Sequence, residues 1–379
     1  MDGPMPVVSR PAAKSVETRR LVATGVAAFT LLMTTFAGNG QPAAAPLLPS
    51  TDTEATPFNI ASVGRPSLRT FTSKDGLPQN AITTIVTDRN GMLWIGTKDG
   101  LASYNGRTWQ VLNMPPEVGK NMIADIVHAE NGDMWVTLHG GGAVCRRADG
   151  SWRYDREPGG SGAGLPVLLA ELDEPGRPST IVLLSQRSFA RFLEGEWILD
   201  PDFPLQGPGI AGAASVFVGD DGVTELWTGL SGGRTARRRH GVWTVFPAPE
   251  GPVADSFFCF VRTRALNGTV QLVAGRLSGL SVFDGEKWIP EPGTAGDERF
   301  VNIFRICESR SPDGSLALWC GSIDGRSFRF ENGQWTVFGS DAKLKDGGVW
   351  SLLATGDARS THAVWIGTAG LGLVRAQFG

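Results

Sequence analysis

The sequence predicts an all-β fold, a seven-bladed β-propeller of four-stranded antiparallel blades, and three observations predict it. A tryptophan-centred pattern recurs at intervals of about 46 residues between residues 94 and 365. Each repeat contains four short apolar segments separated by glycine turns, which is typical of propeller blades. The apolar residues show no 3.6-residue period, so a helical solenoid is excluded.

Two positions of the repeat carry the pattern. The first lies in the second strand, where the occupants are Trp94, Trp135, Val182, Trp227, Val273, Trp319 and Trp365. The other begins the fourth strand, where the occupants are Trp109, Trp152, Trp197, Trp243, Trp288 and Trp335. Because these side chains are large and apolar, we expect them to pack between blades rather than form a ligand cage.

The first repeat predicts the four strands of a blade. Their expected ranges are Ile82 to Thr87, Met92 to Thr97, Leu101 to Tyr104 and Thr108 to Leu112. Asn90-Gly91 and Asn105-Gly106 stand between strands, and Asn-Gly favours tight hairpins because both residues tolerate positive φ.

The two ends of the repeat region complement each other. The seventh repeat ends after its third strand, near Gln377. Residues 68–71 (Leu-Arg-Thr-Phe) precede the first repeat and align with the fourth-strand segments Trp243 to Phe246 and Trp335 to Phe338. We therefore expect the N-terminal strand to complete the last blade, which closes the ring and removes an open sheet edge.

The segment before the propeller predicts export. Residues 1–20 are basic, residues 21–38 carry no charge, and an Ala-rich site ends at residue 45. Residues 1–45 are interpreted as a signal peptide, or as an N-terminal anchor in the inner membrane through residues 21–38. Residues 46–67 are interpreted as an Ala/Pro/Ser/Thr-rich linker, residues 68–379 as the propeller, and the location as periplasmic or otherwise extracytoplasmic.

Composition excludes some classes of protein. Hydrophobic residues make up 41% of the 379 residues and the net charge is −3, which argues against disorder and against nucleic-acid binding. The four cysteines lie far apart, so we expect buried free thiols. A Cys307–Cys320 bridge is the alternative, since both lie on adjacent predicted strands.

The segment Gly76-Leu77-Pro78, followed by Asp88 to Leu101 (DRNGMLWIGTKDGL), resembles the two-component regulator propeller repeat. The second and seventh repeats match this family motif fairly well, whereas repeats three to five are degenerate versions of it. The resemblance implies an extracytoplasmic, non-enzymatic sensor of a membrane-bound regulator, with a kinase or cyclase as partner. No kinase, cyclase or helix-turn-helix signature occurs in this sequence, so the output module is expected outside this chain.

The sequence contains no motif typical of catalysis or of metal binding. The histidines come from different repeats without metal-ligand spacing, and no P-loop, nucleophile elbow or paired-carboxylate motif occurs, so we expect no cofactor, metal or catalytic residue. Arg237-Arg238-Arg239 is a basic cluster, interpreted either as a solvated strand or as a polyanion or lipid-headgroup site. Strand alternation places Arg237 and Arg239 on one face and Arg238 on the other.

Topology indicates which face would bind a ligand. Loops between second and third strands share a face with the long connections between blades, and such variable loops often carry binding residues. The candidates on this face are Lys98, Asp99, His139, Arg187, Arg276 and Asp324. A ring of mixed charge suits a polar or glycan ligand. The alternative functions are a carbohydrate-active propeller enzyme and an interaction scaffold without a small ligand.

Overall fold

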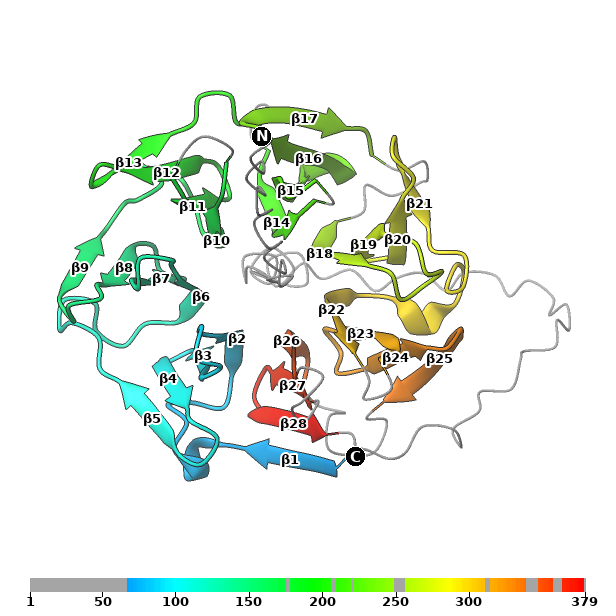
Figure 1. Cartoon of the computed structure of the whole chain (residues 1–379), viewed down its shortest axis with the longest axis horizontal. Coiled ribbons are helices and arrows are strands. Elements are labelled where there is room, and N and C mark those ends of the chain that lie inside the picture. The colour runs from blue at the N-terminus through cyan, green and yellow to red at the C-terminus, as the bar shows by residue number, and fades with distance from the viewer. Residues whose placement is uncertain are drawn as a thin grey trace, which may run out of the picture.

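The computed structural model describes residues 67–174, 178–205, 209–219, 221–248, 256–310, 314–338, 347–356 and 363–377. Within these ranges the chain forms seven four-stranded antiparallel sheets, arranged as blades around one axis (Figure 1). The predicted fold class is confirmed. The expected export segment at 1–45 and nearly all of the linker lie outside the described residues. Within those residues, no helix has the length and apolar character needed to cross a membrane.

Each blade runs from an innermost first strand to an outermost fourth strand. Blade 1 consists of β2 (Ile82–Thr87), β3 (Leu93–Thr97), β4 (Gly100–Tyr104) and β5 (Trp109–Leu112). Blade 2 consists of β6 (Ile123–His128), β7 (Met134–Leu138), β8 (Ala143–Arg146) and β9 (Trp152–Asp155). Blade 3 consists of β10 (Pro166–Leu172), β11 (Thr180–Ser185), β12 (Phe189–Leu193) and β13 (Glu196–Leu199).

The remaining blades repeat this order. Blade 4 consists of β14 (Ala211–Val218), β15 (Thr224–Leu230), β16 (Arg234–Arg239) and β17 (Val242–Phe246). Blade 5 consists of β18 (Phe257–Thr263), β19 (Gln271–Arg276), β20 (Gly279–Phe283) and β21 (Trp288–Pro290). Blade 6 consists of β22 (Ile303–Arg310), β23 (Leu316–Ser322), β24 (Ser327–Glu331) and β25 (Gln334–Phe338). Short 3-10 turns η1 (Ser73–Asp75), η2 (Ser231–Gly233) and η3 (Glu298–Phe300) lie in connections.

Blade 7 is built from both ends of the described chain. It consists of β26 (Val349–Thr355), β27 (Ala363–Thr368), β28 (Leu373–Gln377) and, as its outermost strand, β1 (Ser67–Phe71). The register runs from Ser67 opposite Gln377 to Phe71 opposite Leu373. Figure 1 shows this closure as the blue β1 beside the red β28. The predicted shared blade is confirmed, and β1 begins one residue before the expected boundary.

A glycine in the second strand lets neighbouring blades approach closely. A Cβ at Gly96 would lie 2.6 Å from the Ile123 side chain of blade 2, and one at Gly321 would lie 2.4 Å from Val349 of blade 7. The same contact closes the ring, because a Cβ at Gly367 would lie 2.8 Å from Ile82 of blade 1. Any larger residue would therefore force these blades apart.

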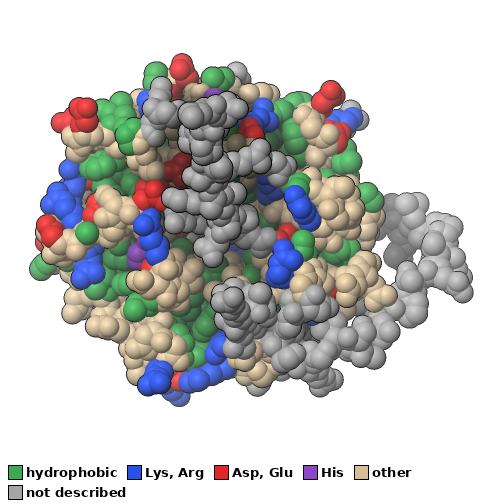
Figure 2. Space-filling model, viewed as in Figure 1, with side chains coloured by type: hydrophobic (Ala, Val, Ile, Leu, Met, Phe, Trp, Pro, Cys, Tyr) green, Lys and Arg blue, Asp and Glu red, His purple; other side chains and the backbone are tan. Residues whose placement is uncertain are grey.

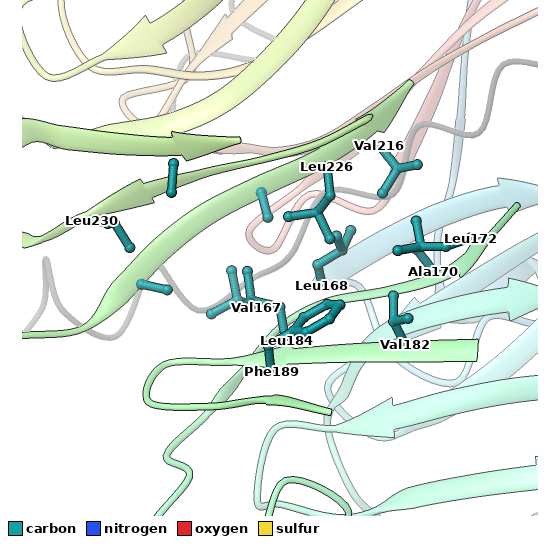
Figure 3. Close-up of a cluster of buried hydrophobic side chains, with 13 residues drawn as sticks. Val167, Leu168, Ala170, Leu172, Val182, Leu184, Phe189, Val216, Leu226 and Leu230 are labelled. Carbon is teal, nitrogen blue, oxygen red and sulfur yellow. The ribbon is translucent and has the colours of Figure 1, made fainter. Parts of the chain in front are cut away.

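The core lies between the blades. Figure 3 shows one such layer, in which Leu184 and Phe189 of blade 3 face Val216 and Leu226 of blade 4. The tryptophans take part in other layers. The ring of Trp135 in blade 2 lies 5.5 Å from that of Trp197 in blade 3, centroid to centroid. The expected packing of tryptophans between blades is confirmed.

All four cysteines are buried free thiols, as expected. Cys307 lies opposite Trp319 in the β22–β23 pair, whereas Cys320 lies opposite Ile306. Side chains alternate along a strand, so Cys307 and Cys320 point to opposite sides of their sheet. The alternative of a Cys307–Cys320 bridge is therefore wrong.

Candidate functional site

Two kinds of connection meet near the axis on one face, here called the loop face. The Lys98 N–H, just after β3, donates to the carbonyl of Ala81, just before β2, at 3.3 Å. The His139 N–H donates to the Met122 carbonyl in the same way at 2.8 Å. These bonds hold the second-to-third-strand loops against the ends of the connections between blades. The face predicted from topology therefore exists.

Lys98 and His139 lie near each other on this face. Lys98 is exposed, and its ammonium lies 5.1 Å from the centroid of the Trp350 ring in blade 7. His139 is half-buried, and burial together with the charge of Lys98 lowers the pKa of His139. The two candidates thus bring an ammonium group and an imidazole with a lowered pKa to the rim of the axis.

The other loop candidates are more dispersed. Asp99 and Arg187 are exposed in their loops, with the Asp99 N–H bound to the Thr97 hydroxyl and the Arg187 N–H to the Ala163 carbonyl. Asp324 forms an ion pair with Arg326 and accepts a hydrogen bond from Ser322. The Asp324 carboxylate therefore already has its partners within its own turn.

Arg276 does not lie in a loop. It is the last residue of β19, it is 6% exposed, and its guanidinium donates to the Ser281 hydroxyl at 2.8 Å and lies over the Phe257 ring. Its expected place among the exposed loop contacts is wrong, because Arg276 is buried at the end of β19, where it pairs with Gly279 of β20. Arg276 stabilises blade 5 from within.

The basic cluster on β16 is also different from both interpretations. Arg238 is 4% exposed and forms ion pairs with Glu174 and Asp200 of blade 3. Arg239 pairs with Asp221 and Glu225, on the opposite face from Arg238 as alternation predicted. Neither a solvated strand nor an anion site describes Arg238, which joins two blades.

The sequence did not reveal a recurrent irregularity in the innermost strands, which lie nearest the axis. Every innermost strand has a register irregularity at its second residue, and the skipped residues are Thr83, Ala124, Val167, Gly212, Phe258, Phe304 and Trp350. This position recurs once in every repeat, and that period is the signal that could have found it. The aromatic residues are confined to blades 5, 6 and 7.

Two buried charges lie next to this ring of residues. Asp125 follows Ala124, and its carboxylate accepts hydrogen bonds from the Ile126 and Leu169 N–H groups. Burial nevertheless raises the pKa of Asp125 to about 7. Arg305 follows Phe304, stacks on its ring at 4.1 Å, and interacts electrostatically with Asp125 across the axis. Burial lowers the pKa of Arg305 to about 10, so it stays charged.

Figure 2 shows acidic and basic side chains scattered over the visible described part of one face of the molecule. Among the described residues, no group of three His, Cys, Asp or Glu side chains could hold a metal ion. His362 lies outside the described residues.

Comparison with known proteins identifies the repeat. The family model described as two component regulator propeller matches residues 76–99, which span the Gly-Leu-Pro turn and β3. A curated relative, Histidine kinase P4 of Formosa agariphila, is 41% identical over 49 residues, which are 13% of this chain and 4% of that protein. The chain therefore matches only a small part of that relative's length. The predicted resemblance is confirmed.

Solved structures share the fold. One is virginiamycin B lyase from Staphylococcus aureus, with TM-score 0.60 and 13% identity over 83% of this chain and 99% of that chain. Others are extracellular domains of a putative hybrid two component system and a putative one component system from B. thetaiotaomicron. Their TM-scores are both 0.58, their identities 14% and 17%, and each alignment covers 82% of this chain. The alignments cover 42% and 40% of those chains. Fold and repeat together define a seven-bladed propeller whose first blade carries a two-component regulator propeller repeat.

Proposed function

We propose that this chain is a non-enzymatic propeller that binds a small polar ligand outside the cytoplasm, through the loop face, as the sensing part of a signalling system. The observation that carries the proposal is the placement of Lys98 and His139 together at the rim of the axis, in a ring that contains a two-component regulator repeat. Loops on a rigid scaffold are favoured sites for binding residues.

Ligand binding should stabilise the folded chain by mass action. A free ligand at 100 times its Kd adds about 2.7 kcal/mol to the free energy of unfolding. A thermal-shift screen of polar metabolites and glycans is the direct test. The double variant Lys98→Gln/Arg187→Gln should remove the shift and leave the ligand-free melting temperature unchanged, because both side chains are exposed. The matched control is Arg107→Gln, at a turn on the opposite face, which should keep the shift.

If the shift survives the double variant and disappears in Arg107→Gln, the loop face is the wrong face. If no compound shifts the melting temperature, an interaction scaffold explains the chain better.

An enzyme is the second candidate, since the fold of virginiamycin B lyase aligns over nearly its whole length. Every hit of the screen should therefore be incubated with the protein and analysed by mass spectrometry. Unchanged compounds support binding without turnover. A converted compound would replace the sensor proposal by an enzymatic one.

The export segment and the partner belong to the same proposal. Residues 21–38 carry no charge and follow a basic stretch, which supports secretion or anchoring in the inner membrane. A reporter enzyme that is active only in the periplasm, fused after Gly379, should be active. Co-purification with a membrane-bound kinase or cyclase would support the signalling role, and an inactive but stable fusion would contradict the location.

A further inference from the structure

The axis has two chemically different sides. At the skipped position of the innermost strands, blades 5 to 7 carry Phe258, Phe304 and Trp350, whereas blades 1 to 4 carry smaller residues. The Phe258 and Phe304 rings lie 5.5 Å apart, and Trp350 belongs to the same apolar cluster. Leu277 and Ile323 of the loop face pack against this cluster, so the aromatic wall lies directly under that face.

The direction of these side chains follows from their neighbours. The residue before the skipped position packs on the previous blade, as Ile303 does on the glycine Gly275. The residue after it is buried among the innermost strands, as Asp125 is when it accepts from the Leu169 N–H at 3.0 Å. In blades 5 to 7, the residue between these two packs in the apolar cluster under the loop face.

Two polar side chains belong to blade 1, whose innermost strand lies beside that of the Trp350 blade. The exposed Lys98 places its ammonium over the Trp350 ring, and among the described residues no carboxylate lies within ion-pair distance of it. Thr83 occupies the skipped position of blade 1, is fully buried, and has no hydrogen-bond partner for its hydroxyl within the described ranges. A buried hydroxyl without a partner loses its hydration energy, and a ligand oxygen can restore it.

We propose that Phe258, Phe304, Trp350, Lys98 and Thr83 form an axial site for a small carboxylate with a flat ring. This deepens the proposed function and rests on it. The ring of the ligand stacks on the aromatic wall, its carboxylate pairs with the Lys98 ammonium, and Thr83 donates to a ligand oxygen. Trp350 is only 2% exposed, so the ligand ring takes the place of groups that now cover the indole, including the Lys98 side chain.

Two sources of this chemistry are arene carboxylates and acidic sugars, because both combine a carboxylate with a ring face that can stack on an aromatic side chain. The probes are benzoate and glucuronate, with benzamide and glucose as uncharged controls, titrated into the full chain by calorimetry. At least one acid should bind, and its neutral counterpart should bind about tenfold more weakly, since a charge-assisted hydrogen bond is lost. Binding of benzoate alone assigns the arene class, and binding of glucuronate alone assigns the sugar class.

Variants locate the site. Lys98→Gln should weaken binding of the acid about tenfold and leave the neutral counterpart unchanged. Lys74→Gln is the matched control, because Lys74 is also exposed on a connection between blades, in η1. Trp350→Leu tests stacking. If this variant fails to fold, Thr83→Val, which conserves shape, provides the second test and should also weaken binding.

The inference is overturned if neither acid binds, or if Lys98→Gln and Lys74→Gln bind it equally. A compound from the wider screen could bind the Lys98→Gln and Thr83→Val variants normally but fail to bind Lys98→Gln/Arg187→Gln. That result would support the proposed function and overturn only the axial site.

Discussion

Replacing Phe71 with alanine should open the ring at its closure. Phe71 ends β1, is 1% exposed, and its ring lies 5.3 Å from Tyr104, 5.6 Å from Trp109 and 6.0 Å from Trp365. Tyr104 and Trp109 belong to blade 1, and Trp365 belongs to blade 7. One side chain thus ties the N-terminal strand to both blades that flank the junction.

The expected loss is large for one substitution. A buried Phe→Ala change removes transfer energy and leaves a cavity, which together cost about 3–5 kcal/mol. The three aromatic contacts add to this cost, because such ring pairs contribute beyond the burial of their area. Since whole domains are stable by only about 5–15 kcal/mol, the variant should unfold at clearly lower denaturant concentration.

The assay is denaturant unfolding, followed by hydrogen exchange of β28 amides. Protection of β28 should fall with stability, since β1 is its outer hydrogen-bonding partner. The control is Thr70→Ala, an exposed neighbour on the same strand, which should change stability by less than about 0.5 kcal/mol. If Phe71→Ala costs no more than Thr70→Ala, β1 does not hold the ring closed.

Two further predictions follow from close contacts and buried charge. Gly367→Ala should destabilise the chain by about 1–3 kcal/mol, because the new Cβ would lie 2.1 Å from the Ser351 hydroxyl of its own blade and 2.8 Å from Ile82 of the next blade. Gly370→Ala is the control, since a Cβ there has open space, and equal melting temperatures of the two variants would contradict the prediction. The pKa of Asp125 is raised to about 7 from its usual 3.8, so the folded chain holds a proton that the unfolded chain releases between these values. The stability that protonated Asp125 contributes should therefore be lost as pH rises from about 4 through 7. In Asp125→Asn, the free energy of unfolding should depend less on pH over this range. An unchanged slope would refute the assignment.

The strands and the closure could be predicted because their signals are local. Asn-Gly pairs mark hairpins, and the first strand of blade 1 was placed at its observed bounds, Ile82–Thr87. The closure needed only a comparison of residues 68–71 with other fourth strands. Each of these inferences depends on a few neighbouring residues and on a period.

The burial and the ion-pair partners of individual charged residues could not be predicted in this way. Alternation gave the correct face for Arg238, but its partner Glu174 lies in another blade, 64 residues away. Arg276 looked like a loop residue because the end of β19 depends on pairing with β20, which extends to Arg276 opposite Gly279. Burial of a charge is decided by contacts between blades, and no pattern within one repeat contains that information.

The axial position differs from the repeat motif in what constrains it. Gly96, Gly321 and Gly367 must stay small, since the next blade packs against them. The skipped residue of the innermost strand varies in size from Gly212 to Trp350. The glycines that pack against the next blade therefore belong to the recognisable repeat motif. The skipped positions, which vary between blades, can hold residues that bind a ligand. A repeat can be recognised without revealing what its propeller binds, and the axial ring is where specificity should be sought.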